Sequence, residues 1–210
     1  GFKYLIDAMP AILKSFPETK LVLIGYGPKE SELKSQVKSL GLGQNILFVG
    51  GKSRSDLSRY YATADIFIGP SIVAAGGDTE GQPAAFIETM ASKTAIIASD
   101  VGGIKDVVMQ GKTGLMIQQK NSQQISDAVL SLCNDKEFKQ LLEKNGRQHI
   151  MERFCWQAIA KKYLGIYERM DQDLESTNRP GPSADWTRLF QIFIAKIFFN
   201  DSLQIVRAEI

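Results

Sequence analysis

The chain has 210 residues, of which 44% are hydrophobic and 23% are charged, and its formal net charge is +2. This length allows one domain with its own core and a short extension, and the composition is that of an ordinary soluble globular protein. Lysine and arginine are interspersed with aspartate and glutamate and form no basic block, which argues against a nucleic-acid-binding protein.

Short apolar runs alternate with helical patterns up to Met170. Strands are expected in KLVLIG (20–25), ILFVG (46–50), ADIFIGPS (64–71), TAIIAS (94–99) and GLMI (114–117). Helices are expected at Phe2–Phe16, Lys29–Leu40, Pro83–Ser92, Ser122–Cys133, Asp135–Glu152 and Trp156–Met170, with one more after Ser53, which can form a capping box with Asp56. Nearly continuous apolar strands that alternate with helices predict an α/β fold, with a Rossmann-like parallel β-sheet and helices on both faces.

The sequence changes character after Met170. Residues 171–185 are polar and rich in proline and glycine, which predicts a linker between domain 1–170 and the tail 186–210. The tail begins WTRLFQIFIAKIFF, where Arg188, Gln191 and Lys196 interrupt the apolar run and make it too short for a membrane-spanning helix. Three interpretations stay open: a helix that docks on a partner protein, a helix at a membrane interface that gives peripheral membrane association, and a sequence artefact.

Few residues indicate a metal or a disulfide. Cys133 and Cys155 are too few for a disulfide framework, so we expect packing residues in a reducing cytoplasm. His149 has no second metal ligand beside it and is expected to be structural. The chain begins with an amphipathic helix rather than a signal peptide, and it lacks an initiator methionine. We therefore expect a fragment of a cytoplasmic protein, and a position at the inner face of the membrane stays open.

The first strand is followed by a glycine-containing loop, GYGPKE. Gly25 and Gly27 match the first two glycines of a dinucleotide-binding fingerprint, but Glu30 stands where the third glycine is required. The pattern is therefore weak support for an NAD-dependent dehydrogenase. It fits equally a tight turn from strand to helix, or a backbone that a ligand can approach closely.

The segment GGDTEGQPAAFIETMAS (76–92) passes from a loop of small residues into a helix. Pro83 is expected in the first turn of that helix, where its missing N–H is tolerated. The free N–H groups at such a helix start, and those of Gly81 and Gln82 just before it, attract phosphate or carboxylate. Two acids beside this start, Asp78 and Glu80, fit a ligand that carries hydroxyls as well as phosphates.

Glu88 lies on the same helix, flanked at helical spacing by alanines, so an inward-facing carboxylate that binds hydroxyls and an ordinary solvated glutamate both remain open. Glu80 and Glu88 could meet the spacing of a glycosidase pair, roughly 5–10 Å. Hydrolysis does not need an anion site between the two carboxylates, whereas transfer from a sugar nucleotide does.

Several motifs together are similar to one family. The stretch PSIVAAGGDTEGQPAAFIETMASKTAIIASDVGGIKDVV resembles the donor-site signature of retaining glycosyltransferases of family four, which have the GT-B fold. The segments LVLIGYGP, ILFVGG, ADIFIGPS, GKTGLMI and RFCWQAIAKKYLGIYERM occur in the order of that family. More narrowly, GDTEGQP resembles bacterial exopolysaccharide enzymes of the colanic-acid type. The resemblance covers about residues 1–170.

The resemblance implies roles for individual residues of the donor site. Glu80 matches the acid that contacts the donor sugar near the reacting carbon, and Glu88 matches the acid that binds the ribose hydroxyls. The segment whose backbone contacts sugar and diphosphate is matched by Gly81, Gln82 and Pro83. The glycine loop beside the cleft is matched by Gly25 and Gly27, and the turn that holds the base by Gly51 and Lys52. No role is implied for Asp78.

The implied activity is transfer of a hexose from a nucleoside-diphosphate sugar to a polysaccharide or lipid-linked acceptor, without a metal or another cofactor. This chain would be the C-terminal, donor-binding half of such an enzyme. The acceptor-binding N-terminal domain is missing, as are an Arg and a Lys that the family usually carries before the first helix. The isolated fragment is therefore expected to be inactive. The alternatives are a non-catalytic nucleotide-binding or interaction module and the dehydrogenase considered above.

Overall fold

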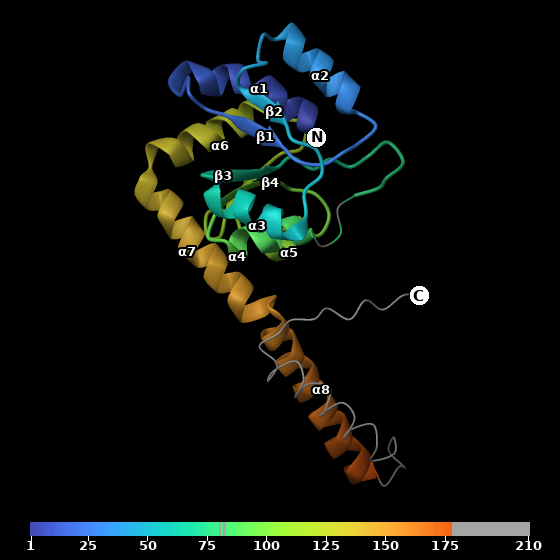
Figure 1. Ribbon diagram of the computed structural model, residues 1–210. Helices are drawn as coiled ribbons and strands as arrows, with labels where there is room; N and C mark the ends of the chain where they lie inside the picture. Colours follow the sequence, from blue (N-terminus) through green and yellow to red (C-terminus); the bar gives the residue numbers. More distant parts are fainter. Residues whose placement is uncertain (80, 82, 178–210) are drawn as a thin grey trace. The chain divides into compact units, whose positions relative to one another are not determined.

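The computed structural model describes residues 1–79, 81 and 83–177, with only the backbone for 171–177. Two of the predicted site residues, Glu80 and Gln82, and the predicted tail 186–210 lie outside the described residues. The chain divides into two units, residues 1–151 and 152–210. The first unit contains the five strands and helices α1 to α6 (Figure 1).

All five predicted strands are present and every pairing is parallel. Strand β1 (Leu21–Leu23) pairs with β2 (Ile46–Phe48). Strands β3 (Ile66–Gly69), β4 (Ala95–Ser99) and β5 (Leu115–Ile117) pair in that order. The predicted parallel α/β class is confirmed, but hydrogen bonding divides the strands into a two-stranded and a three-stranded sheet rather than one.

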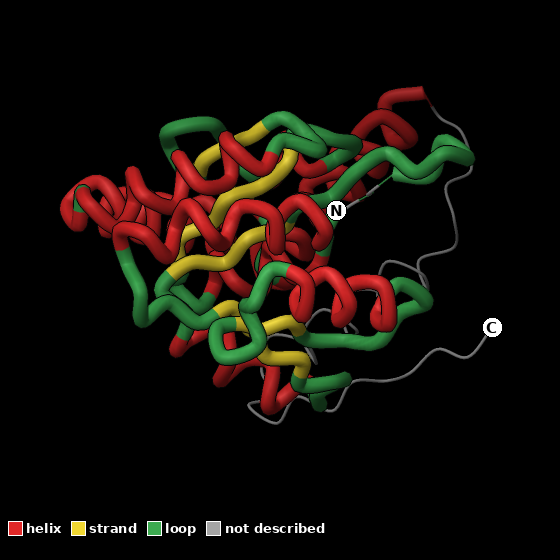
Figure 2. Tube along the Cα trace, turned by 90° about the horizontal axis from the view of Figure 1, so that it is seen from above, coloured by secondary structure: helices red, strands yellow, loops and turns green. Residues whose placement is uncertain are grey.

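The predicted helices are also present. The helices of the described chain are α1 (Phe2–Ser15), α2 (Glu30–Ser39), α3 (Arg54–Thr63), α4 (Ala84–Ala91), α5 (Ile104–Val107), α6 (Ser122–Asn134), α7 (Lys136–Arg153) and α8 (Trp156–Thr177). Only the short α5 was not predicted. Helices α1, α2 and α6 pack together on one side of the strands, and α3 and α4 on the other (Figures 1 and 2).

Helix α1 supplies much of the core because its apolar residues fall on one face. Leu5, Ile6, Met9 and Ile12 follow helical spacing, and each is at most 2% exposed. They belong to one core cluster that also contains residues of both sheets, namely Leu23, Ile46, Ala95, Ile97 and Ile117. One hydrophobic core therefore serves both sheets.

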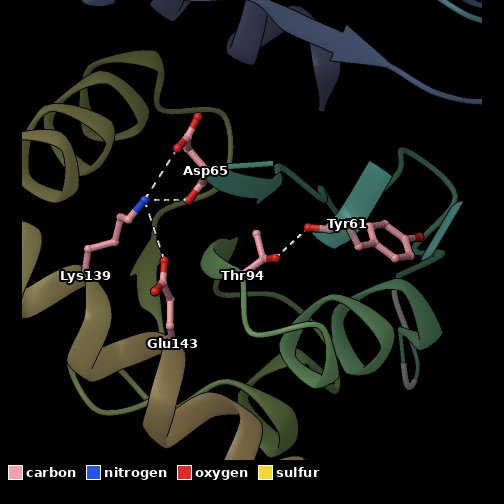
Figure 3. A network of polar contacts seen from close by, with 5 residues as sticks. All are labelled: Tyr61, Asp65, Thr94, Lys139 and Glu143. Carbon is pink, nitrogen blue, oxygen red and sulfur yellow. Dashed lines mark hydrogen bonds and ion pairs between the residues drawn. The ribbon is translucent and has the colours of Figure 1, made fainter. Parts of the chain in front are cut away.

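A polar network fixes the amino ends of two strands (Figure 3). The Thr94 hydroxyl, just before β4, donates to the Tyr61 carbonyl at 2.6 Å. The Lys139 ammonium donates to the carbonyl of Asp65, just before β3, and lies 3.6 Å from the Glu143 carboxylate. Because parallel strands end at the opposite edge, this network stabilises the fold and leaves the carboxyl edge free for a site.

The second unit consists, as far as it is described, of the end of α7 and helix α8. Helix α8 continues to Thr177, so it extends past the predicted end at Met170 into the first residues of the stretch 171–185 that was predicted to be a linker. Its side chains Trp156, Tyr163 and Met170 are each more than half exposed. Among the described helices, none is long and apolar enough to cross a membrane.

Cys133 is a half-buried thiol that packs against the core, in line with the packing role predicted for it. The half-buried Cys155 sulfur accepts a hydrogen bond from the Ala158 N–H at 3.4 Å. His149 is 7% exposed. Within the described residues, no group of three or more His, Cys, Asp or Glu side chains is arranged to hold a metal ion.

Candidate functional site

The loops after β1 and β2 lie together at the carboxyl edge of the first sheet. The N–H of Gly25 donates to the Gly50 carbonyl at 3.0 Å, and Gly25 has φ +125°, a conformation that favours glycine. The Tyr26 ring lies against the second loop, since a Cβ on Gly51 would be 2.7 Å from its Cε2. The structure therefore brings the predicted loop of Gly25 and Gly27 next to the predicted Gly51 turn.

The space beside the first loop is open. A Cβ placed on Gly25 or Gly27 would meet no atom of the described residues within 4 Å. The carbonyl of Gly27 accepts from the N–H of Glu30 at 3.1 Å, so the loop is also the tight turn into α2. Lys52, after Gly51, is half-buried. The glycine loop is therefore a tight turn from strand to helix, and its backbone is also open to a ligand. The two structural interpretations are compatible.

Helix α3 begins directly after the Gly51 turn. The Ser53 hydroxyl accepts from the Asp56 N–H at 3.2 Å and lies 2.7 Å from the Asp56 carboxylate, so the predicted cap is confirmed. This cap fixes Arg54 as the first helical residue. The Arg54 Nη2 lies 3.5 Å from Glu88 Oε1, and the two side chains are 73% and 34% exposed.

Glu88 is thus neither fully solvated nor buried. Its carboxylate pairs with the side chain of Arg54, the first residue of α3, and α3 follows the turn of Gly51 and Lys52. Its negative charge also reaches Tyr61: burial, and secondly the charge of Glu88, raise the pKa of the Tyr61 hydroxyl. No sequence signal pointed to Arg54, because nothing in the pattern connects residue 54 with residue 88. Only the fold brings them together.

Helix α4, which carries Glu88, is anchored by an aromatic side chain. Phe86 is 3% exposed, and its ring packs edge-on against the Phe67 ring with 5.4 Å between the ring centroids. The Phe67 ring packs edge-on against Tyr61 in turn, with 5.9 Å between the centroids. The Phe86 ring also occupies the space that a side chain on Gly69 would need, with Cε2 and Cε1 2.7 and 2.8 Å from a Cβ there. The glycine at the end of β3 therefore allows α4 to pack closely against this strand.

The predicted position of Pro83 is off by one residue. Pro83 is the N-cap of α4, with φ −76° and ψ 104°, and Ala84 is the first helical residue. The prediction placed Pro83 inside the helix because the fixed φ of proline suits both the N-cap position and the first helical position. The N–H groups of Ala84 and Ala85 still stand in the first turn of the helix, where an N–H has no acceptor within the helix itself.

Gly81 lies against the turn after β4. A Cβ on Gly103 would be 3.1 Å from the Gly81 carbonyl carbon and closer still to its oxygen, so this approach requires glycine at position 103. The contact of Gly103 with Gly81 was not predicted from the sequence. Asp78 is exposed, and its carbonyl accepts from the Ala74 N–H at 2.8 Å in the loop before α4. The structure assigns no ligand role to it.

The chain is similar to known glycosyltransferases. The family described as glycosyl transferases group 1 matches residues 1–149. A GDP-mannose-dependent alpha-(1-6)-phosphatidylinositol monomannoside mannosyltransferase of Mycobacterium tuberculosis is 30% identical over 163 residues, covering 77% of this chain and 42% of the relative. Spore coat protein SA of Bacillus subtilis is 29% identical over 180 residues, covering 80% of this chain and 45% of the relative. The chain spans less than half the length of these relatives.

Solved structures agree with the fold. Sucrose-phosphate synthase of Thermosynechococcus elongatus superposes with a TM-score of 0.67 at 27% identity, covering 82% of this chain and 43% of that chain. The C-terminal domain of a glycosyl transferase group 1 family protein from Francisella tularensis superposes with a TM-score of 0.64 at 27% identity, covering 74% of this chain and 80% of that one. The predicted fold class, the C-terminal half of a GT-B fold, is confirmed. Because the family match spans 149 of 210 residues, this chain belongs to the glycosyl transferases group 1 family.

Proposed function

We propose that this chain is the donor-binding domain of a retaining glycosyltransferase that transfers a hexose from a nucleoside-diphosphate sugar to a polysaccharide or lipid-linked acceptor. The observation that carries the proposal is the position of Glu88. Its half-buried carboxylate pairs with Arg54 at the start of α3. Glu88 is also four residues after Ala84, the first residue of α4, which is roughly 6 Å along the axis of that helix. Hydroxyl-binding and phosphate-binding groups thus stand at the spacing of a ribose and its diphosphate.

The proposed roles follow from this placement and from the family resemblance. Glu88 accepts hydrogen bonds from the ribose hydroxyls. In the free protein, the Arg54 side chain takes the place of these hydroxyls beside the Glu88 carboxylate. The N–H groups at the start of α4 bind the diphosphate and stabilise the charge that gathers on it as the glycosidic bond breaks. Gly25 and Gly27 let the ligand approach the backbone, and the turn of Gly51 and Lys52 holds the base.

The sugar side of the site includes two residues outside the described chain, Glu80 and Gln82. We propose that Glu80 supports positive charge developing on the donor sugar, and that the backbone of Gly81, Gln82 and Pro83 contacts sugar and diphosphate. No metal or other cofactor takes part in this scheme, because the helix N–H groups supply the charge stabilisation. The acceptor site belongs to an N-terminal domain outside this chain, and reaction on cytoplasmic exopolysaccharide precursors is the setting we favour.

The relatives support a nucleotide-sugar donor, but they do not identify the nucleotide that this chain binds. One relative is named as GDP-mannose-dependent, and it shares 30% of its aligned residues with this chain. We therefore propose testing UDP, GDP and ADP side by side.

Calorimetric titration of the chain with these three nucleotides tests the proposal. One of them should bind, and Glu88→Ala should weaken it roughly 10- to 100-fold, since hydrogen bonds to a charged group contribute about 1.5–3 kcal/mol. Glu18→Ala is the matched control, because Glu18 is exposed and precedes β1, at the opposite edge of the sheet. Binding of none of the three, or equal binding by both variants, would refute the proposed site.

A further inference from the structure

The Tyr26 side chain is highly exposed, yet its ring rests on the protein backbone. It is 83% exposed, more than any other large apolar or aromatic side chain in the described part of the chain. A Cβ on Gly50 would be 3.2 Å from Cε1 of the ring, and a Cβ on Gly51 would be 2.7 Å from Cε2. The two edges of the ring thus face two successive glycines. The ring therefore lies across the turn that follows β2.

Glycine at position 51 fits the ring rather than the backbone conformation. Gly50 has φ +67°, a left-handed conformation that favours glycine by itself. Gly51 is not among the glycines with a positive φ, so its backbone would accept other residues. The three atoms nearest to a Cβ at position 51 all belong to the Tyr26 ring. The ring and the two glycines therefore form one feature, which we call the Tyr26 platform (Tyr26, Gly50 and Gly51).

Hydrogen bonds between the two loops hold the Tyr26 platform together. The Gly25 N–H donates to the Gly50 carbonyl at 3.0 Å, and the Val49 N–H donates to the Leu23 carbonyl at 3.1 Å. One face of the Tyr26 ring is covered by the turn, and its exposure of 83% leaves the other face open. A ring that buries so little area contributes little to folding, whereas a planar ligand on its open face would bury more of it.

The Tyr26 platform lies beside the residues that we propose for the ribose. Gly51 is three residues ahead of Arg54, so their Cα atoms are at most roughly 11 Å apart. Arg54 in turn lies 3.5 Å from the Glu88 carboxylate. A nucleotide carries its base on the same ribose whose hydroxyls Glu88 would bind. The open face of Tyr26 is therefore a flat apolar surface next to the proposed ribose position.

We propose that the open face of the Tyr26 ring stacks on the base of the bound nucleotide. The proposal rests on the donor site described under the proposed function and adds a base-contacting residue to it. Stacking is tolerant of base identity, because every base has a π-face. Tyr26 therefore strengthens binding of whichever nucleotide the site accepts, and the choice among bases belongs to polar groups at the base edges. The ring supplies the contact, so the hydroxyl is not required.

Calorimetric titration of Tyr26 variants with UDP, GDP and ADP is the first test. Tyr26→Ala should weaken the nucleotide that binds by about 5- to 100-fold, the range that loss of one base–aromatic stack gives. Tyr26→Phe should bind like the unaltered chain. Tyr163→Ala is the matched control, because Tyr163 is an exposed tyrosine on α8, in the other unit of the chain. Thermal melting should show no loss of folding, since Tyr26 is so exposed.

Two results of this titration would overturn the stacking. One is binding by Tyr26→Ala that is as tight as that of the unaltered chain, or tighter, because the ring would then be idle or in the way. The other is an equal loss in Tyr26→Phe and Tyr26→Ala, because the hydroxyl would then carry the contact.

A double-mutant cycle tests the geometry of the platform. Gly51→Ala keeps Tyr26 but places a methyl group 2.7 Å from Cε2, which lifts the ring from the turn and should weaken nucleotide binding. In a chain that already carries Tyr26→Ala, the same change should have little further effect, because no ring remains to be lifted. An equal loss in both backgrounds would overturn the platform, since Gly51 would then act on the nucleotide directly.

NMR of ring-labelled tyrosine completes the test and separates the two proposals. The Tyr26 signal, assigned by its absence in Tyr26→Phe, should move upfield when the nucleotide is added, because the ring current of the base shields protons stacked on it. An unmoved signal in a chain that binds nucleotide would overturn the stacking. Binding that needs Glu88 but not Tyr26 would leave the proposed donor site standing without the stacking, whereas binding of no nucleotide would overturn both.

Discussion

The close approach of Phe86 to Gly69 can be tested with a double-mutant cycle. Gly69→Ala places a methyl group within 2.7–2.8 Å of Cε2 and Cε1 of a ring that is 3% exposed and has little room to move. Overpacking of this kind costs about 1–3 kcal/mol. Phe86→Leu alone should cost a similar amount, since it loses the edge-on contact with Phe67 and leaves part of the ring's volume empty.

The double variant should be more stable than the sum of the single effects predicts, because leucine lacks the ring atoms that the new methyl group strikes. We expect a coupling free energy of about 1–2 kcal/mol, measured by urea unfolding followed by circular dichroism. Nucleotide affinity should change with stability across the four proteins, because Phe86 holds the helix that carries Glu88. Additive effects, within about 0.5 kcal/mol, would refute the packing explanation.

Two further predictions concern Tyr61 and Thr94. Burial and the charge of Glu88 raise the pKa of Tyr61 above its ordinary 10.0, so the unfolding free energy should fall as the pH rises above 10.0, where the unfolded phenol loses its proton first. In Glu88→Gln, NMR of ring-labelled tyrosine should show that the pKa of Tyr61 falls part of the way toward its ordinary value, because burial still raises it. An unchanged pKa would show that the charge of Glu88 does not act on Tyr61. Thr94→Val removes the buried hydrogen bond to the Tyr61 carbonyl and should cost about 1–3 kcal/mol in urea unfolding. Thr63→Val removes an exposed hydrogen bond to the Arg59 carbonyl and should cost far less, and equal losses would show that burial does not raise the contribution of the Thr94 bond.

Sequence patterns predicted the elements well because each has a strong local signal. The strand at Ala95–Ser99 is an uninterrupted apolar run, and Ser53 with Asp56 is a capping pair whose bond depends only on neighbouring residues. Helix α5, by contrast, has four residues, too few for a helical period to be recognised. The end of α8 was missed because residues 171–177 are polar, and a polar stretch can continue a helix as readily as it forms a linker.

The geometry around the candidate site follows from the sequence where the motif is continuous, and it does not where it depends on distant segments. Glu88 and the start of α4 lie in one stretch of chain, so their proximity follows from helix geometry. The pairing of Arg54 with Glu88 and the contact of Gly103 with Gly81 join different loops, and no local pattern encodes them. The division into two sheets was also not predictable, since strand order depends on which edges meet in space.

A crystal structure of the chain with the nucleotide that binds in the titration tests the central claim most directly. The account predicts ribose hydroxyls within hydrogen-bonding distance of the Glu88 carboxylate, with Arg54 displaced from its present contact at 3.5 Å. It also predicts the diphosphate at the N–H groups of Ala84 and Ala85, and the base beside the turn of Gly51 and Lys52. A nucleotide whose ribose lies away from Glu88, or whose phosphates bind at another strand end, would contradict it.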